Sequence, residues 1–131
     1  MTNIPFSLEL KVRDYECDMQ GIVNHAVYLN YLECARHEFL LSKGLSFAEL
    51  TARGVTIVVI RAELDYRQAL RTGDKFQVTV SARQVSRLKL VFDQEISKLP
   101  EGKLMLQAQI TATSINQRKR PYFPEELKAL L

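Results

Sequence analysis

Apolar and polar residues alternate at the start of the chain. Apolar side chains occupy every second position from Phe6 to Val12, and this period of two is typical of a half-buried strand. The alternation stops between Tyr15 and Asn24, where Gly21 offers a backbone conformation that other residues resist. We therefore predict a strand that faces a core on one side, followed by a loop.

The next apolar pattern has helical spacing. From Val27 to Phe39 apolar residues recur at steps of three and four, and Gly44 follows where helices commonly stop. Asn24 precedes this pattern, and its short side chain can accept hydrogen bonds from the first free amides of a helix. The pattern predicts a helix from Asn24 to about Lys43, about 30 Å long at about 1.5 Å per residue. A helix of that length crosses a small domain.

Shorter segments fill the rest of the chain. Ser46 and Glu49 form a capping box that predicts a short helix through Ala52. Four later segments, rich in β-branched or alternating apolar residues, predict strands at 55–66, 75–85, 87–98 and 103–115. Short turns such as RTGD and LPEGK join them, and Pro124 opens a final short helix. This order predicts the α+β class, with an antiparallel sheet covered on one face by the long helix. Because such a sheet has open edges that invite pairing with another chain, we also expect a dimer.

Composition limits the classes of protein to which the chain can belong. Its 131 residues are 47% hydrophobic and 25% charged, which is ordinary globular usage, so we expect residues 1–131 to form a single domain. No apolar run approaches the roughly 20 residues of a membrane-spanning helix, and MTNIPFSLEL lacks the pattern of a signal peptide, so we expect a cytoplasmic protein. Cys17 and Cys34 have no metal-ligand spacing with other Cys or His residues, so we expect neither a metal site nor another cofactor.

The net charge is +3, and basic residues gather late in the chain. Nucleic-acid binders carry stronger basic patches, so the sequence does not favour that class. One interpretation of these cations is a solvated surface, and the functional alternative is a site for a phosphate-bearing small molecule. The candidates are Arg83, Arg87, Arg118, Lys119 and Arg120.

Asp18 is the first candidate for chemistry. It lies six residues before Asn24, in the loop that leads to the long helix. Free amides and the positive end of the dipole at a helix start can stabilise a developing oxyanion. A carboxylate beside them could attack a carbonyl or activate a water, as acyl transfer requires. The alternative is an aspartate that only caps a turn, and His25 is compatible with an exposed residue of the first helical turn.

Polar residues along the long helix are further candidates. Glu33 shares a helix face with Arg36 and with His37, at spacings of three and four. Such pairs are also ordinary ion pairs of a solvated face, and Tyr28 fits the core as well as a ligand site. The sequence has no GxSxG, GxGxxG or GxxxxGK[ST] motif, so α/β-hydrolase and nucleotide-binding functions lose their main support.

The central part of the sequence resembles a known family. The segment DMQGIVNH that begins at Asp18, with Tyr28, Glu33 and Arg36 further on, resembles the signature of the 4-hydroxybenzoyl-CoA thioesterase-like family, which has the hotdog fold. The resemblance covers nearly the whole chain, including the RTGDKF turn and the ending at 116–121. Through VRDYE, GIVN and RHEFL the chain is most similar in look to the small acyl-acyl-carrier-protein thioesterases of plants and cyanobacteria.

The resemblance implies a fold and an activity. The fold would be an antiparallel sheet wrapped around the long helix, with two subunits joined in one continuous sheet, often as a dimer of dimers, and active sites at the subunit interface. The activity would be hydrolysis of an acyl-CoA or acyl-carrier-protein thioester in fatty acid metabolism. Asp18 would be the nucleophile or the general base.

The resemblance also implies roles for neighbouring residues. Backbone amides near Asn24 and His25 match the site that polarises the thioester carbonyl. Gly21 and Tyr28 belong to the same expected oxyanion and substrate-binding segment. The late basic residues would hold phosphates of coenzyme A or of a carrier-protein pantetheine arm.

Several alternatives stay open. Another hotdog type draws its carboxylate from the central helix, which makes Glu33 a supporting or competing acid, and Arg36 could hold Asp18 or Glu33 by a charged hydrogen bond. A non-catalytic module that binds acyl thioesters would have the same fold. A hotdog dehydratase or hydratase would need a different signature, such as Pro-x-His, and neither His25 nor His37 lies in one.

Overall fold

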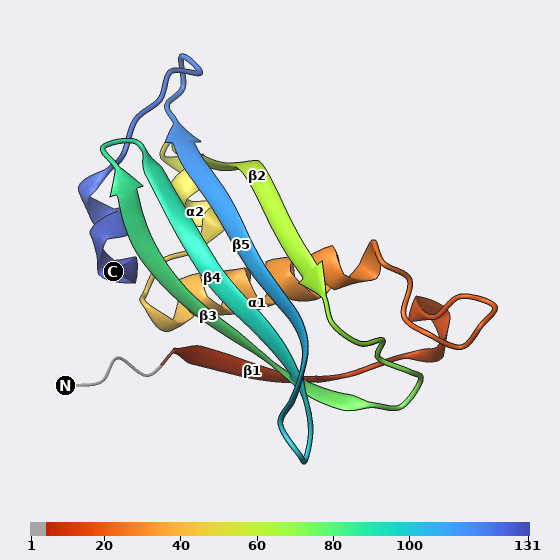
Figure 1. Ribbon diagram of the computed structural model, residues 1–131. Helices are drawn as coiled ribbons and strands as arrows, with labels where there is room; N and C mark the ends of the chain where they lie inside the picture. The colour runs from red at the N-terminus through yellow and green to blue at the C-terminus, as the bar shows by residue number, and fades with distance from the viewer. Residues whose placement is uncertain (1–4) are drawn as a thin grey trace.

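The computed structural model describes residues 5–131, and its layers are a sheet and a helix that crosses one face of it (Figure 1). The elements are β1 (Phe6–Lys11), the 3₁₀ helix η1 (Asp14–Glu16), α1 (Val27–Ser42), α2 (Phe47–Ala52), β2 (Thr56–Tyr66), β3 (Lys75–Ser86), β4 (Lys89–Lys98), β5 (Lys103–Ile115) and the 3₁₀ helix η2 (Glu125–Leu130). All strand pairs are antiparallel, and the order across the sheet is β1-β3-β4-β5-β2. The predicted α+β class is confirmed.

The core lies between α1 and the sheet. Leu32 of α1 is 0% exposed. The ring of Tyr31 lies 4.6 Å from that of Phe76 on β3, and the ring of Phe39 lies 6.4 Å from that of Phe92 on β4. Burying a large apolar side chain stabilises a fold by about 1.5–3 kcal/mol, so these contacts fix α1 against the middle of the sheet.

The start of α1 differs from the prediction. The helix begins at Val27 rather than at Asn24, and its N-cap position is Ala26, which has no side-chain cap. The Oδ1 atom of Asn24 accepts from the Ala26 amide at 2.9 Å, and its carbonyl accepts from the Val27 amide at 2.9 Å. Asparagine bonds readily to the backbone two residues on, so it builds a turn before the helix instead of capping it.

The other helical predictions hold. The Oγ atom of Ser46 accepts from the Glu49 amide at 3.1 Å and caps α2. Gly44 adopts a φ of 76° just after α1 ends. The short helix expected after Pro124 is present as the 3₁₀ helix η2.

β2 forms one edge of the sheet and pairs with β5 alone among residues 5–131. A register shift between Val59 and Arg61 marks a β-bulge in this strand. Val59 and Ile60 are 47% and 48% exposed, so apolar side chains lie uncovered along an edge of eleven residues. The open edge that the sequence predicts is confirmed.

Candidate active site

The loop that carries Asp18 is a narrow hairpin that projects beyond the start of α1, at the right of Figure 1. Cys17 and Val23 form an isolated antiparallel bridge at its base. The Asp18 amide donates to the Ile22 carbonyl at 2.9 Å, and the Gly21 amide donates to the Asp18 carbonyl at 3.0 Å. Gly21 has a φ of 78°, which an L side chain adopts only at a cost, so glycine is required for this tight turn.

The carboxylate of Asp18 lies at the tip of this hairpin. Its Oδ1 atom accepts from the Gln20 amide at 2.9 Å, which fixes the side chain against its own turn. The residue is exposed, as are its neighbours Met19 and Tyr15, at 104% and 79%. The carboxylate is therefore accessible to a ligand, and the turn-capping and chemical interpretations of Asp18 both fit one protomer.

The amides at the start of α1 are not equivalent. The Asn24 amide donates to the Glu16 carbonyl at 3.0 Å, and the Ala26 amide is taken by the Asn24 side chain. Between them, the His25 amide has no acceptor within hydrogen-bonding distance among residues 5–131. Of the two amides that the sequence points to, the one at His25 is therefore available to an oxyanion, near the positive end of the helix dipole.

Glu16 holds the hairpin in place, although the sequence does not single it out. Its Oε1 atom accepts from the Arg13 amide and from the Tyr31 hydroxyl, both at 2.8 Å. The Glu16 side chain is only 11% exposed, and Tyr31 is 5% exposed. Burial, and the hydrogen bond to Glu16, raise the pKa of Tyr31, so its hydroxyl stays protonated and donates to the carboxylate. The pair ties Glu16, two positions before Asp18, to the second turn of α1.

Two further tyrosines fix the start of the helix. The Tyr66 hydroxyl donates to the His25 carbonyl at 3.0 Å and so joins the end of β2 to the candidate oxyanion amide. Tyr28 is 3% exposed, and its hydroxyl accepts from the Leu70 amide at 2.9 Å. Burial raises the pKa of Tyr28. Tyr28 is thus a core residue, and within one protomer it is not exposed in the way that the Asp18 carboxylate is.

Glu33 and Arg36 lie away from the hairpin. The Oε1 atom of Glu33 is 3.7 Å from Nε2 of His37, and both side chains are on the exposed face of α1. Arg36 is 7% exposed, and its Nη1 atom donates to Oε1 of Gln94 at 3.0 Å. The hydrogen bond to Asp18 or Glu33 that the sequence allows for Arg36 is not formed among residues 5–131, because the guanidinium turns inward to β4. Burial lowers the pKa of Arg36.

Gln94 is a buried polar residue that the sequence analysis missed. It is 1% exposed, and its Nε2 atom donates to the Leu32 carbonyl at 3.0 Å. Leu90, Phe92 and Ile96 share its face of β4. A glutamine at an alternate position among these apolar residues was the feature of the sequence that could have indicated a buried polar contact. The side-chain amide of Gln94 thus provides hydrogen-bond partners for the Leu32 carbonyl of α1 and for the Arg36 guanidinium, both of which lie in an otherwise apolar layer.

The late basic residues do not form one cluster. Arg83 donates from Nε to Oδ2 of Asp93 at 2.8 Å on the sheet face away from α1, and this contact raises the pKa of Arg83. Arg87 lies in the turn between β3 and β4, and residues 118–120 lie in the turn after β5. Arg83 is therefore already paired with a carboxylate, that of Asp93. The other basic candidates lie at the end of the sheet.

Comparison with known proteins identifies the family to which the chain belongs. Residues 12–131 match the model of a thioesterase-like superfamily. The chain belongs to this superfamily. The match includes the hairpin, α1 and all strands except β1.

Curated relatives of this thioesterase-like chain are named as thioesterases. An acyl-acyl carrier protein thioesterase of Arabidopsis thaliana is 40% identical over 114 residues, which are 87% of this chain and 60% of that protein. The chain therefore spans only three fifths of that relative. The long-chain acyl-CoA thioesterase FadM of Escherichia coli is 32% identical over 108 residues, which are 82% of this chain and 81% of that protein.

The fold of this thioesterase-like chain recurs in solved structures. A hypothetical protein of Aquifex aeolicus superposes with a TM-score of 0.91 and 32% identity, over 97% of this chain and 100% of that chain. The long helix against a five-stranded antiparallel sheet is the hotdog arrangement, so the predicted fold is confirmed.

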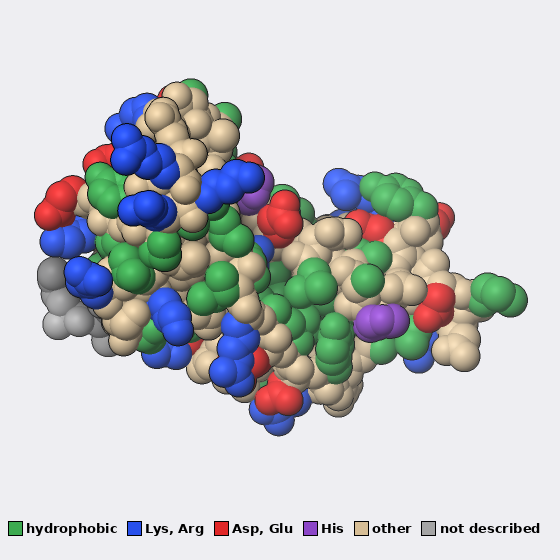
Figure 2. All heavy atoms as spheres, turned by 90° about the horizontal axis from the view of Figure 1, so that it is seen from above, with side chains coloured by type: hydrophobic (Ala, Val, Ile, Leu, Met, Phe, Trp, Pro, Cys, Tyr) green, Lys and Arg blue, Asp and Glu red, His purple; other side chains and the backbone are tan. Residues whose placement is uncertain are grey.

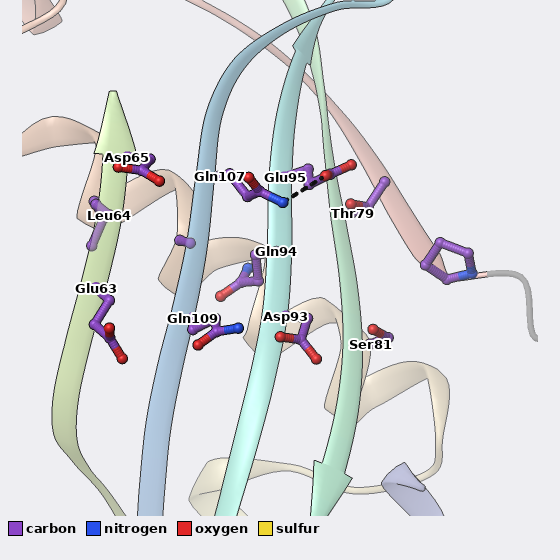
Figure 3. A pocket seen from close by; sticks show the side chains of 12 residues that line it. Glu63, Leu64, Asp65, Thr79, Ser81, Asp93, Gln94, Glu95, Gln107 and Gln109 are labelled. Atoms are coloured by element: carbon purple, nitrogen blue, oxygen red, sulfur yellow. Dashed lines mark hydrogen bonds between the residues drawn. The ribbon is translucent and has the colours of Figure 1, made fainter. Parts of the chain in front are cut away.

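A hollow of about 660 Å³ in the thioesterase-like chain lies on the sheet face away from α1 (Figure 3). Carboxylates of Glu63, Asp65, Asp93 and Glu95 point from β2 and β4 into it, and Gln107 of β5 donates to Glu95 at 3.4 Å. None of the residues expected at the active site lines it. We therefore separate this hollow from the candidate site at the hairpin.

Two further expectations concern membranes and metals. Within residues 5–131, no helix of the thioesterase-like chain is both long and apolar enough to cross a membrane. In the same part of the chain, no group of three or more His, Cys, Asp or Glu side chains is arranged around a possible metal position.

Proposed function

We propose that this chain hydrolyses acyl thioesters, with Asp18 as the reacting carboxylate and the His25 amide as an oxyanion donor. The observation that carries the proposal is the combination of an exposed carboxylate on a rigid turn and an unoccupied amide at the start of α1. Membership of the thioesterase-like superfamily supports this reaction class.

The proposed chemistry adds water across the thioester. Asp18 either attacks the carbonyl carbon, giving an anhydride that water then opens, or takes a proton from a water that attacks directly. In both routes the carbonyl oxygen gains negative charge, which the His25 N–H stabilises. The C–S bond breaks, the thiolate takes up a proton, and the products are a free acid and a thiol. Neither route requires a metal or cofactor.

The substrate we propose is an acyl-carrier-protein or acyl-CoA thioester. The names of the Arabidopsis and Escherichia coli relatives support these two carriers. Arg87, Arg118, Lys119 and Arg120 are the proposed contacts for the anionic part of the carrier; Arg83 is excluded because it is paired with Asp93.

We also propose that the working unit is a dimer joined through β2. Its long open edge with exposed Val59 and Ile60 fits pairing with a second copy. A two-fold axis makes such pairing antiparallel, so the start of one β2 lies beside the end of the other. Tyr66 at the end of β2 bonds to His25, whereas Thr56 at its start pairs with Ile115, just before the basic turn.

The dimer brings together groups that are far apart in one protomer. Ten residue steps separate Thr56 from Tyr66, and at about 3.3 Å each these ends lie about 30 Å apart. In the antiparallel dimer, the hairpin of one protomer faces Arg118 of the partner subunit. A substrate held by the basic turn of one subunit then reaches Asp18 of the other.

The test compares Asp18→Asn with a matched control, Asp14→Asn, in the same exposed region. Thiol release is measured on one acyl group carried by carrier protein, coenzyme A and pantetheine. Asp18→Asn is expected to lower kcat by at least about a hundredfold, as losses of a nucleophile or base do, and Asp14→Asn to leave it within about twofold. Undiminished release by Asp18→Asn would refute the role of Asp18. Saturable binding without any thiol release by the wild type would fit the non-catalytic module instead.

The His25 amide is tested by two substitutions at one position. His25→Ala retains the N–H and is expected to keep most of the activity. His25→Pro removes the N–H and is expected to lower kcat by about 10²–10³, the range for loss of one oxyanion donor. Circular dichroism and the melting temperature show whether each variant is folded. Equal activity of the two folded variants would exclude this amide as a donor.

A further inference from the structure

Five Lys and Arg side chains gather at one end of the sheet. None of them lies within ion-pairing distance of a carboxylate in the described chain, residues 5–131. They come from the turn between β3 and β4, from the first residue of β4, and from the turn after β5. They are Arg87, Lys89, Arg118, Lys119 and Arg120. Figure 2, seen from above, shows blue Lys and Arg side chains spread over the part of the molecule opposite the projecting hairpin.

The acidic residues at this end do not neutralise these cations. Glu125 is 3.1 Å from Lys128, and Glu126 is 3.4 Å from Arg53, so each acid is paired with another cation. The five cations therefore contribute a local field of one sign, although the whole chain carries only +3.

The turn after β5 has a fixed shape. The Oδ1 atom of Asn116 accepts from the Arg118 amide at 2.9 Å and from the Arg120 amide at 3.2 Å. The Asn116 amide donates to the Arg120 carbonyl at 2.9 Å, and Lys119 adopts a left-handed φ of 61°. All three basic residues are exposed. The backbone of the turn therefore needs little further ordering on binding.

An aromatic ring lies between two hollows at this end. Tyr122 is 46% exposed and lines both of them. One hollow, of about 410 Å³, also has Arg87 and Lys128 in its lining. The other, of about 430 Å³, also has Arg53 and Arg118. The surface thus combines an apolar ridge with positive charge on both sides, which is the composition of a protein-binding surface.

We propose that this basic end docks an acidic carrier protein whose prosthetic arm delivers the acyl thioester. The proposal rests on the thioesterase function above and selects a carrier protein as the partner. The cations span β3 to β5, about 10 Å across at about 4.8 Å per strand, and they extend further along both turns. One phosphate group is too small to meet them all, whereas an acidic protein surface meets them together.

The position of the basic end fits delivery to the partner subunit. In the dimer proposed above, the turn after β5 lies beside the hairpin of the other protomer. A carrier docked there extends its arm along the β2 junction toward Asp18 of the partner subunit. Charge of opposite sign also steers the encounter, which makes the association rate sensitive to salt.

The experiment uses the intact protein and one acyl group on three carriers: an acidic acyl carrier protein, coenzyme A and pantetheine. The test variant is Arg118→Glu/Arg120→Glu. The matched control, Lys75→Glu/Lys103→Glu, makes the same change in charge at the opposite ends of β3 and β5. The test variant is expected to lower kcat/KM on the carrier protein at least about tenfold at low salt, and to leave pantetheine within about twofold. Salt is expected to lower the wild-type value on the carrier protein and to change the variant little.

Three results would overturn the proposal. An unchanged kcat/KM on the carrier protein would remove the docking role. An equal loss on coenzyme A would assign the cations to phosphate groups, and an equal effect of the control variant would show only a net-charge effect. If the wild type releases no thiol from any of the three carriers, the thioesterase function fails, and direct titration with the unacylated carrier protein then decides docking. Tight, salt-sensitive binding that is lost in the test variant supports docking, and no binding refutes it.

Discussion

Replacing Tyr31 with Phe removes one hydroxyl and leaves the ring in place against Phe76. The lost contact is the 2.8 Å hydrogen bond to Glu16, which is 11% exposed. A hydrogen bond to a charged group stabilises a protein by about 1.5–3 kcal/mol, and the carboxylate would keep the Arg13 amide and the Arg13 guanidinium, whose Nη1 atom lies 3.8 Å from its Oε2 atom. We expect a loss of about 2 kcal/mol, which lowers the melting temperature by about 6–10 °C in a domain of this size.

The measurement is thermal unfolding at pH 7, combined with thiol release from acyl-pantetheine. Burial and Glu16 raise the pKa of Tyr31, so the contribution of its hydroxyl is fully present below the unfolded pKa of about 10 and is lost at higher pH. Tyr122→Phe makes the same chemical change at a 46% exposed ring and is expected to shift stability by less than about 0.5 kcal/mol.

Glu16 separates positioning from direct chemistry. Glu16→Gln keeps an oxygen that accepts from Arg13 and Tyr31, so it is expected to retain most of the kcat. Glu16→Ala loses both contacts, and with the hairpin released we expect kcat to fall about tenfold while the KM for pantetheine changes little. If Tyr31→Phe melts at the wild-type temperature, or if Glu16→Gln is as inactive as Glu16→Ala, this explanation of the hairpin is wrong.

Three other changes test single features of the structure. Gly21→Ala forces a side chain into a φ of 78° and is expected to cost about 1–2 kcal/mol in chemical denaturation, although there is open space around the new Cβ. Ser46→Ala removes the cap of α2 and is expected to cost about 1 kcal/mol, against less than about 0.5 kcal/mol for the exposed Ser81→Ala. Val59→Lys is expected to weaken self-association in analytical ultracentrifugation, and Val85→Lys, an equally exposed valine far from the β2 edge, is the control; equal dissociation by both would contradict pairing through β2.

The strands were predictable because burial follows a period of two. In β4 and β5 most buried positions alternate along the face that packs on the core, although Val91 and Met105 are buried beside Phe92 and Leu106. α2 was predictable because Ser46 and Glu49 interact within one turn. These elements depend on contacts between residues close in sequence, or on one uniform core face, and both are visible in a single chain.

The start of α1 and the partners of Arg36 were not predictable in this way. Asn24 is of a residue type that caps helices, but its side chain accepts from the Ala26 amide in a turn before the helix, and the Asn24 amide holds that turn to the Glu16 carbonyl across the hairpin. Arg36 has a carboxylate three residues before it, yet it bonds to Gln94, 58 positions later. The first outcome depends on the pairing of the two sides of the hairpin and the second on the packing of α1 against β4, and sequence spacing describes neither.

The candidate site also has a part that the sequence could predict and a part that it could not. Asp18 and His25 lie near each other in the sequence, so their segment could be recognised, and the structure adds which amide is unoccupied. The basic residues lie about 90 positions later and at the other end of β2, so in one protomer they have no route to the hairpin. An open edge strand whose two ends carry complementary halves of a site is completed by antiparallel pairing with itself, because the two-fold axis superposes the start of one strand on the end of the other. On this reasoning, the dimer contact and the path of the substrate arm are one property of β2. Weakening the Val59 edge is therefore expected to lower kcat/KM on the carrier protein, as loss of the basic turn does, and to leave pantetheine within about twofold.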